Sequence, residues 1–272
     1  MRFRTGVLLM FLVVFSIRSN AQAISFSPTR LFFKGNPGET LTETITISNS
    51  GKDPYEFITS IQDWKRDSLG NKVYFPMGTL VNSNGRNISL SSTNLKLNPG
   101  EKKSFTVSML IPKTQKENPI SSNSMLFFTQ TNARFPQTQE KTGFGIRISL
   151  ELGIQLFYIP NEGKSGVMNF LAFDAGVITV KGRNLQRLAV KFENTGEISK
   201  DGYVRFELTN KQTGEELKIK PIPIAIMPKD SQWVYYTMDN ELPAGEYLGV
   251  AILDAGENYN LKVAERDIHV KK

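Results

Sequence analysis

The sequence predicts an all-β protein with two β-sandwich domains in tandem, preceded by a cleavable signal peptide. Short segments of alternating apolar and polar residues recur at spacings of about 8–15 residues, and Gly, Pro and Asn turn signals separate them. No segment sustains the 3.6-residue period of an amphipathic helix. This combination is typical of sandwiches of short antiparallel strands. A polar stretch near the middle of the chain divides the segments into two groups of similar length.

Residues 1–23 read as the signal peptide. Arg2 and Arg4 form a positively charged start, an apolar run follows from Gly6 to Ile17, and Ala21-Gln22-Ala23 fits the small-x-small rule for a cleavage site. The apolar run is too short to span a membrane comfortably. Arg18, directly after that run, leaves open that the segment is retained as an anchor. We therefore expect an exported chain with no membrane span after cleavage.

The first predicted domain covers residues 24–160. Turn signals at Asn49–Pro54, Asp67–Lys72 and Asn98–Glu101 separate its clearest strands. Gly, Pro, Asn and Asp at such sites supply the backbone angles that tight turns require. Strands are expected at 40–50, at 55–65, on either side of the third turn within 95–112, at 124–131 and at 146–160.

Residues 161–165 form a polar linker, and the second predicted domain covers residues 166–272. About seven strands are expected in this domain. They are placed at 176–182, 188–196, 203–210, within 215–228, and at 232–238, 245–256 and 261–270. The two halves are similar in size but are not obvious sequence repeats, so each is expected to bury a core of its own.

Charge and cysteine content exclude several classes of function. Loss of Arg2, Arg4 and Arg18 with the signal peptide leaves 30 basic and 26 acidic residues, and the basic ones are scattered rather than gathered in a stripe. Nucleic-acid binding is therefore not expected. The chain has no cysteine, which removes disulfides, thiolate metal sites and cysteine nucleophiles.

Residues that could catalyse a reaction or hold a metal are sparse. His269 is the only histidine, and a single His near a terminus builds neither a zinc site nor a Ser-His-Asp triad. The segment Asp67–Asn71 faintly resembles a calcium loop but lacks the alternating oxygen ligands and the closing glutamate. We therefore predict no enzyme activity, no catalytic residues, no metal and no cofactor.

The segment Ile146–Pro160 is the most informative part of the sequence. Apolar side chains occupy every second position from Ile146 to Leu156, with Arg147 and Glu151 in the alternate register. A strand with one apolar face can be a central strand that covers its own core. It can also run past its sandwich as an edge and serve as a template for strand addition. The residues alone leave both interpretations open.

Five segments of the first half, in order along the chain, are ISFSPTRLFFKG, LTETITISNSGKDPYEF, LKLNPGEKKSFTVSML, SMLFFTQT and IRISLELGIQLFYIP. Together they resemble the PapD-like periplasmic pilus-assembly chaperones, a family of two immunoglobulin-like domains. The resemblance covers about residues 24–160. It implies that both sandwiches are immunoglobulin-like, that the protein is periplasmic, and that it works without ATP or metal.

The resemblance also implies a mechanism of strand donation. In that family a pilin subunit lacks the last strand of its own sandwich, and the chaperone fills the resulting groove with its long G1 strand. By position, the donated side chains here are Ile146, Ile148, Leu150 and Leu152. The implied partners are pilin-like subunits with an incomplete sandwich and an outer-membrane usher. A dimer in which the free protein caps itself through G1 is a further possibility.

The family anchors the C-terminal carboxylate of the subunit between the two domains, with an Arg on the first strand and a Lys on G1. Arg30 matches the Arg, but Gln155 stands where the Lys belongs and loses its charge-assisted hydrogen bond. The family's interdomain ion pair is missing too, since Asn123 and Ile159 occupy its positions. These departures keep an alternative open: a non-catalytic immunoglobulin-like binding or structural module of a cell-envelope complex.

Overall fold

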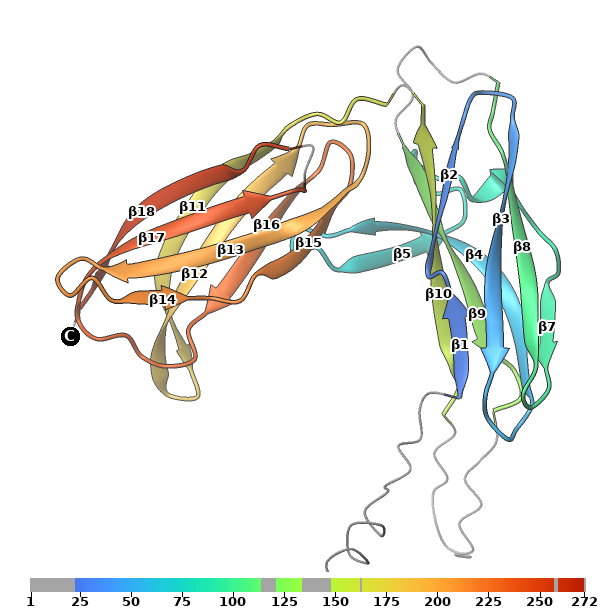
Figure 1. Cartoon of the computed structure of the whole chain (residues 1–272), viewed down its shortest axis with the longest axis horizontal. Coiled ribbons are helices and arrows are strands. Elements are labelled where there is room, and N and C mark those ends of the chain that lie inside the picture. The colour runs from blue at the N-terminus through green and yellow to red at the C-terminus, as the bar shows by residue number, and fades with distance from the viewer. Residues whose placement is uncertain (1–22, 114–120, 134–147, 162, 257–258, 272) are drawn as a thin grey trace, which may run out of the picture.

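The computed structural model describes residues 23–113, 121–133, 148–161, 163–256 and 259–271. Residues 1–22 of the predicted signal peptide, Glu162 of the predicted linker and the predicted donor residue Ile146 lie outside these ranges. The described part is almost entirely β and forms two immunoglobulin-like sandwiches (Figure 1). The predicted fold class is confirmed. Within the described ranges, no helix has the length and apolar character needed to cross a membrane.

The first sandwich consists of a four-stranded and a six-stranded sheet. Its elements are β1 (Ile24–Ser27), β2 (Arg30–Gly35), β3 (Thr40–Asn49), β4 (Tyr55–Arg66), β5 (Lys72–Pro76), the short 3-10 helix η1 (Gly85–Asn87), β6 (Ile88–Leu90), β7 (Asn94–Leu97), β8 (Lys102–Leu110), β9 (Ser122–Gln130) and β10 (Glu151–Pro160). One sheet has the order β1-β3-β8-β6. The other has the order β2-β10-β9-β4-β5, with β7 also paired to β4.

Alternation along the strands builds the first core. In β8 every second side chain is buried, at Phe105, Val107 and Met109, and β3 buries Ile45 and Ile47 in the same sheet. All five side chains are at most 1% exposed. Burying an apolar side chain of this size stabilises the fold by roughly 1.5–3 kcal/mol. The opposite sheet closes this core with alternate residues of β2, β4, β9 and β10.

The second sandwich consists of a three-stranded and a five-stranded sheet. Its strands are β11 (Met168–Val180), β12 (Arg183–Asn194), β13 (Lys200–Asn210), β14 (Glu216–Lys218), β15 (Ile222–Ile226), β16 (Ser231–Thr237), β17 (Gly245–Asp254) and β18 (Lys262–Val270). The sheet orders are β11-β12-β16 and β14-β13-β17-β18, with β15 also paired to β13. Its core is separate from the first one.

Two details differ from the predicted strands of the second half. β11 begins at Met168, well before the predicted start at residue 176. The predicted segment 215–228 is divided into β14 and β15, and Pro221 lies in the break between them. A proline has no N–H to give to a sheet, which explains why pairing stops there.

The same asparagine corner occurs in both sandwiches. Asn49 ends β3, where its Oδ1 accepts the N–H of Gly51 at 2.9 Å and its Nδ2 donates to loop carbonyls. Asn194 ends β12, where its Oδ1 accepts the N–H of Gly196 at 2.8 Å and its Nδ2 donates to two loop carbonyls. Both side chains are 1% exposed. Each corner satisfies main-chain groups that a buried loop would otherwise leave unpaired.

The β4–β5 hairpin reaches from the first sandwich to the second (Figure 1). At its tip the carbonyl of Ser68 accepts the N–H of Trp233 in β16 at 2.7 Å. Behind the tip a small apolar cluster of the first domain also includes Met227 of the second domain. The cluster consists of Trp64, Met125, Phe127, Phe157 and Met227. The hairpin and this cluster therefore join the two sandwiches.

Candidate strand-donating edge and interdomain cleft

β10 is paired on both sides along only part of its length. Its antiparallel pairing with β9 runs from Glu151 to Tyr158. Its parallel pairing with β2 begins only at Gln155, opposite Arg30. The first four residues, Glu151–Ile154, therefore have a neighbouring strand on the β9 side alone within the described part of the chain. This half of β10 is an edge of the sheet.

The direction of the backbone groups shows which hydrogen-bonding groups are unpaired at this edge. Gln155 donates its N–H to the carbonyl of Thr29, on the β2 side, at 3.0 Å. Backbone groups alternate in direction along a strand, so those of Gly153 and Glu151 point to the same side. No described strand pairs with them there. Unpaired N–H and C=O groups in such a row can accept an additional strand.

The side chains of the predicted donor segment fall into two classes. Ile148 is 72% exposed, whereas Leu150 and Leu152 are half-buried and pack against the first core. Further along β10, Ile154 and Leu156 are fully buried. The strand begins at Glu151, later than the alternation from Ile146 predicts. Within the described segment Ile148 is thus the apolar side chain that is free to enter another protein.

The residues just before β10 are tied to the end of β9. The N–H of Gln130 donates to the carbonyl of Leu150 at 2.8 Å, and the hydroxyl of Ser149 donates to the carbonyl of Gln130 at 2.8 Å. Glu151 accepts a hydrogen bond from the hydroxyl of Thr129 at 2.7 Å. These bonds fix the position at which Ile148 leaves the sandwich.

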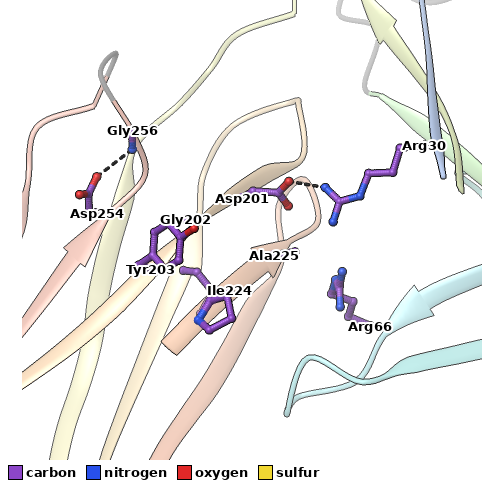
Figure 2. A pocket seen from close by; sticks show the side chains of 10 residues that line it. Arg30, Arg66, Asp201, Gly202, Tyr203, Ile224, Ala225, Asp254 and Gly256 are labelled. Carbon is purple, nitrogen blue, oxygen red and sulfur yellow. Dashed lines mark hydrogen bonds and ion pairs between the residues drawn. The ribbon is translucent and has the colours of Figure 1, made fainter. Parts of the chain in front are cut away.

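A cleft of about 570 Å³ lies where the two domains meet (Figure 2). It is lined by Arg30 and Arg66 of the first domain and by Asp201, Tyr203 and Asp254, among others, of the second. Arg30 forms an ion pair across the cleft with Asp201. The predicted anchor residue Arg30 therefore does face the space between the domains, but its charge already has a partner.

Gln155, the other predicted anchor residue, lies next to Arg30 in the parallel register. It is only 8% exposed, and among the described residues that line the cleft it does not appear. Its Oε1 is buried without a hydrogen-bond partner. A buried acceptor left unpaired is uncommon and costs free energy. Gln155 is thus buried beside Arg30 and is not one of the residues that line the cleft.

Arg66, at the end of β4, also lines the cleft. The sequence did not predict this position for it. Its Nη1 donates to the carbonyl of Gly70 at 2.6 Å, and its Nε is buried without a partner. Burial lowers the pKa of Arg66, with Asp201 acting in the opposite direction and the charge of Arg30 lowering the pKa further. The only signal in the sequence was an Arg at the end of an alternating strand, directly before a turn.

Asn123, at one of the two positions where the resembled family has an interdomain ion pair, makes neutral hydrogen bonds instead. Asn123 is buried, donates from Nδ2 to the carbonyl of Trp64 at 2.8 Å and accepts from Nδ2 of Asn82 at 2.8 Å. These are neutral hydrogen bonds inside the first domain. No buried charge is left unpaired at Asn123, which is consistent with the joint loss of both ionic partners.

The sole histidine has an ordinary surface environment. His269 in β18 contacts the carboxylate of Glu246 in the neighbouring strand β17. In the part of the chain that the structure describes, no group of three or more His, Cys, Asp or Glu side chains is arranged to hold a metal ion.

No family model matches the chain, and no curated protein matches it by sequence. Solved structures of fimbrial chaperones are similar to it. A structure of the Salmonella enterica SafA pilin in complex with the SafB chaperone matches at 11% identity over 93% of this chain and 98% of that one, with a TM-score of 0.45. The CsuC–CsuE chaperone–tip subunit complex of Acinetobacter baumannii Csu pili matches at 14% identity over 90% and 98%, with a TM-score of 0.44. The Escherichia coli chaperone DraB matches at 17% identity over 89% and 98%, with a TM-score of 0.42. These TM-scores lie below 0.5, so function is inferred from the chain's own strands and side chains.

Proposed function

We propose that this protein is a periplasmic chaperone that caps pilin-like, β-rich subunits by lending them the open edge of β10, without catalysing a reaction. The observation that carries the proposal is that Glu151–Ile154 are paired on one side only. A client with an incomplete sandwich can form main-chain hydrogen bonds along this edge. The apolar side chains of the donor segment then fill the grooves between the client's strands.

The donor residues contribute in different ways. Ile148 is free to enter the client, and Ile146 continues the same alternation two residues earlier. Full burial of one such side chain contributes roughly 1.5–3 kcal/mol. Leu150 and Leu152 keep their contacts with the first core and extend a continuous apolar surface towards the client.

Arg30 is proposed to hold the C-terminal carboxylate of the client at the base of the cleft. Gln155 is proposed to assist it from the neighbouring strand, since its amide has a free acceptor atom and a rotation of the amide would turn its NH₂ group towards the ligand. In a hydrogen bond from Gln to a carboxylate the donor is uncharged, so the bond is weaker than one donated by the charged amine of a Lys.

In this proposal residues 1–23 direct export to the periplasm, and an outer-membrane usher is the second partner that receives the capped subunit. In the absence of a client, the same edge can pair with a second copy of the chain in a self-capping dimer.

The test is capture of a client by the tagged mature protein from the native periplasm, followed by mass spectrometry of what co-purifies. The variant Ile148→Asp places a charge on the proposed donor side chain. The matched control is Val177→Asp, because Val177 is also an exposed strand residue, 62% accessible, but lies in the second domain. We expect a small β-rich partner with the wild type and with Val177→Asp, and none with Ile148→Asp.

Thermal unfolding of both variants completes this experiment. Unchanged unfolding of Ile148→Asp would show that loss of the client reflects the lost donor contact. If Ile148→Asp captures the same partner as the wild type, strand donation through this residue is wrong.

A second candidate function is a non-catalytic binding or structural module of an envelope complex. It is favoured by one observation, the ion pair of Arg30 with Asp201, which occupies the proposed anchor. A large envelope partner that is insensitive to Ile148→Asp would support this candidate.

A further inference from the structure

Two arginines of the first domain line the interdomain cleft together with one carboxylate of the second domain, Asp201. Arg30 begins β2, Arg66 ends β4, and Asp201 is the second residue of β13. Figure 2 shows both guanidinium groups directed into the cleft, with Asp201 bonded to Arg30. The two arginines reach the same space from different strands of one sheet.

Of the two arginines, Arg30 alone is bonded to a carboxylate among the described residues. Asp201 is bonded to Arg30, and the carboxylate of Asp254, which also lines the cleft, is turned to the N–H of Gly256. Arg66 is bonded to a neutral carbonyl and lies over the ring of Trp64, 5.6 Å from its centroid. Its buried Nε has no partner. Asp230 also acts on Arg66 through its charge, but no carboxylate of the described residues is bonded to Arg66.

Lys72 adds a third positive charge close to the two arginines. It lies over the same Trp64 ring, 5.7 Å from its centroid. Burial lowers the pKa of Lys72, and the charges of Arg66 and Arg30 lower it further. A bound anion would relieve this repulsion.

We infer that Arg30 and Arg66 together form a site for a carboxylate, and that Asp201 occupies this site in the free protein as an internal competitor. The inference rests on the proposed function, which supplies the carboxylate as the C-terminus of the client. Arg66 then provides the second positive charge that Gln155 does not.

The exposure of the groups explains why the competition is reversible. The side chains of Arg30 and Asp201 are 37% and 60% exposed, and ion pairs exposed to this degree are weak. Arg66 is partly buried, so a carboxylate bonded to it is screened less by water and salt than one at the surface. Because Asp201 is tethered, it competes with an effective concentration on the millimolar scale. A free carboxylate binds tightly only when strand donation holds it in place.

The test is a titration with acetate, followed by NMR of the arginine Nε–Hε signals at constant ionic strength, with acetamide as the uncharged control ligand. In the wild type we expect weak acetate binding at Arg30. In Asp201→Asn we expect acetate to bind about 5–10-fold more tightly, since the tethered competitor is removed. Asp254→Asn removes the same charge from the cleft without freeing Arg30, and we expect it to behave like the wild type.

The role of Arg66 is tested in the Asp201→Asn background. Arg66→Gln should abolish the gain in acetate affinity, and acetamide should not bind to any variant. The inference is overturned if Asp201→Asn and the wild type bind acetate equally, or if Arg66→Gln keeps the gain. Asp201→Ser repeats the test with a different side chain, should Asp201→Asn fold poorly.

This experiment is independent of the donor strand. A failed acetate titration, together with loss of client capture in Ile148→Asp, would leave strand donation standing and remove only the two-arginine site. The reverse result would keep the carboxylate site and remove strand donation.

Discussion

The N–H of Trp233 donates to the carbonyl of Ser68 at 2.7 Å, and this bond links the tip of the β4–β5 hairpin to the edge of a sheet in the other domain. Trp233 lies in β16, the edge strand of the sheet β11-β12-β16. The hairpin thus forms a direct main-chain link between the two domains. It also holds Arg66, two residues before Ser68, at the cleft.

The conformation of Gly70 is essential to this hairpin. Gly70 has φ +82°, and a Cβ on it would lie 3.1 Å from Oε1 of Gln232 in β16. We expect Gly70→Ala to lower the free energy of unfolding by about 2 kcal/mol, from left-handed strain and from displacement of Gln232. Urea unfolding measures the change.

The matched control for that substitution is Gly214→Ala. Gly214 has φ +74° and open space around its Cβ position. Gly214→Ala is therefore expected to cost only the left-handed backbone strain, about 1 kcal/mol of unfolding free energy. Equal losses of unfolding free energy in the two variants would mean that the contact of position 70 with Gln232 in β16 adds nothing to the cost.

Asp67 should make the stability of the hairpin depend on pH. The side-chain hydrogen bond from Asn71, together with the hairpin's own N–H groups, lowers the pKa of Asp67 below its ordinary value of 3.8. The ionised form therefore stabilises the folded state above pH 3.8, and this contribution is lost as the pH falls through the lower pKa of the folded state. We expect wild type to be more stable than Asp67→Asn at pH 6 and the difference to shrink towards pH 2. A difference that does not change with pH would exclude the carboxylate as its source.

Leu152 and Ile148 should respond differently to truncation. Leu152 packs against the first core, so Leu152→Ala is expected to cost about 1–2 kcal/mol of stability. Ile148 is exposed, so Ile148→Ala should change stability by less than about 0.5 kcal/mol. Thermal and urea unfolding compare the two. An equal cost would assign Ile148 to its own core and remove it as a donor.

The asparagine corners should be the most sensitive polar positions. Asn49→Ala or Asn194→Ala leaves buried main-chain groups without partners and is expected to destabilise its domain by about 2–3 kcal/mol. Asn94→Ala, at an exposed position of β7, serves as the control and should be nearly neutral. Denaturant unfolding, followed for each domain, measures these losses.

Local patterns were sufficient for the fold class and for most strands. The alternation at 40–50 and 55–65 corresponds to β3 and β4, and the turn signal at Asp67–Lys72 corresponds to the β4–β5 connection. These patterns depend on neighbours along the chain, which the sequence displays directly. The domain boundaries and the signal peptide remain predictions.

The candidate site was only partly predictable. Arg30 was placed at the cleft, and the alternation before Pro160 pointed to β10. The sequence did not indicate that Leu152 serves its own core, because alternation is the same whichever partner covers the apolar face. It also did not indicate that Gln155 is buried and does not line the cleft.

The two-residue period of an extended chain made most strands, and the apolar face of each, readable from the sequence. The packing of the folded chain decided where β2 stops covering β10, and so which part of the edge is open. It also decided that Asp201, 171 residues from Arg30, bonds to it across the cleft. Contacts at that separation depend on how two domains pack together, and no local pattern encodes them.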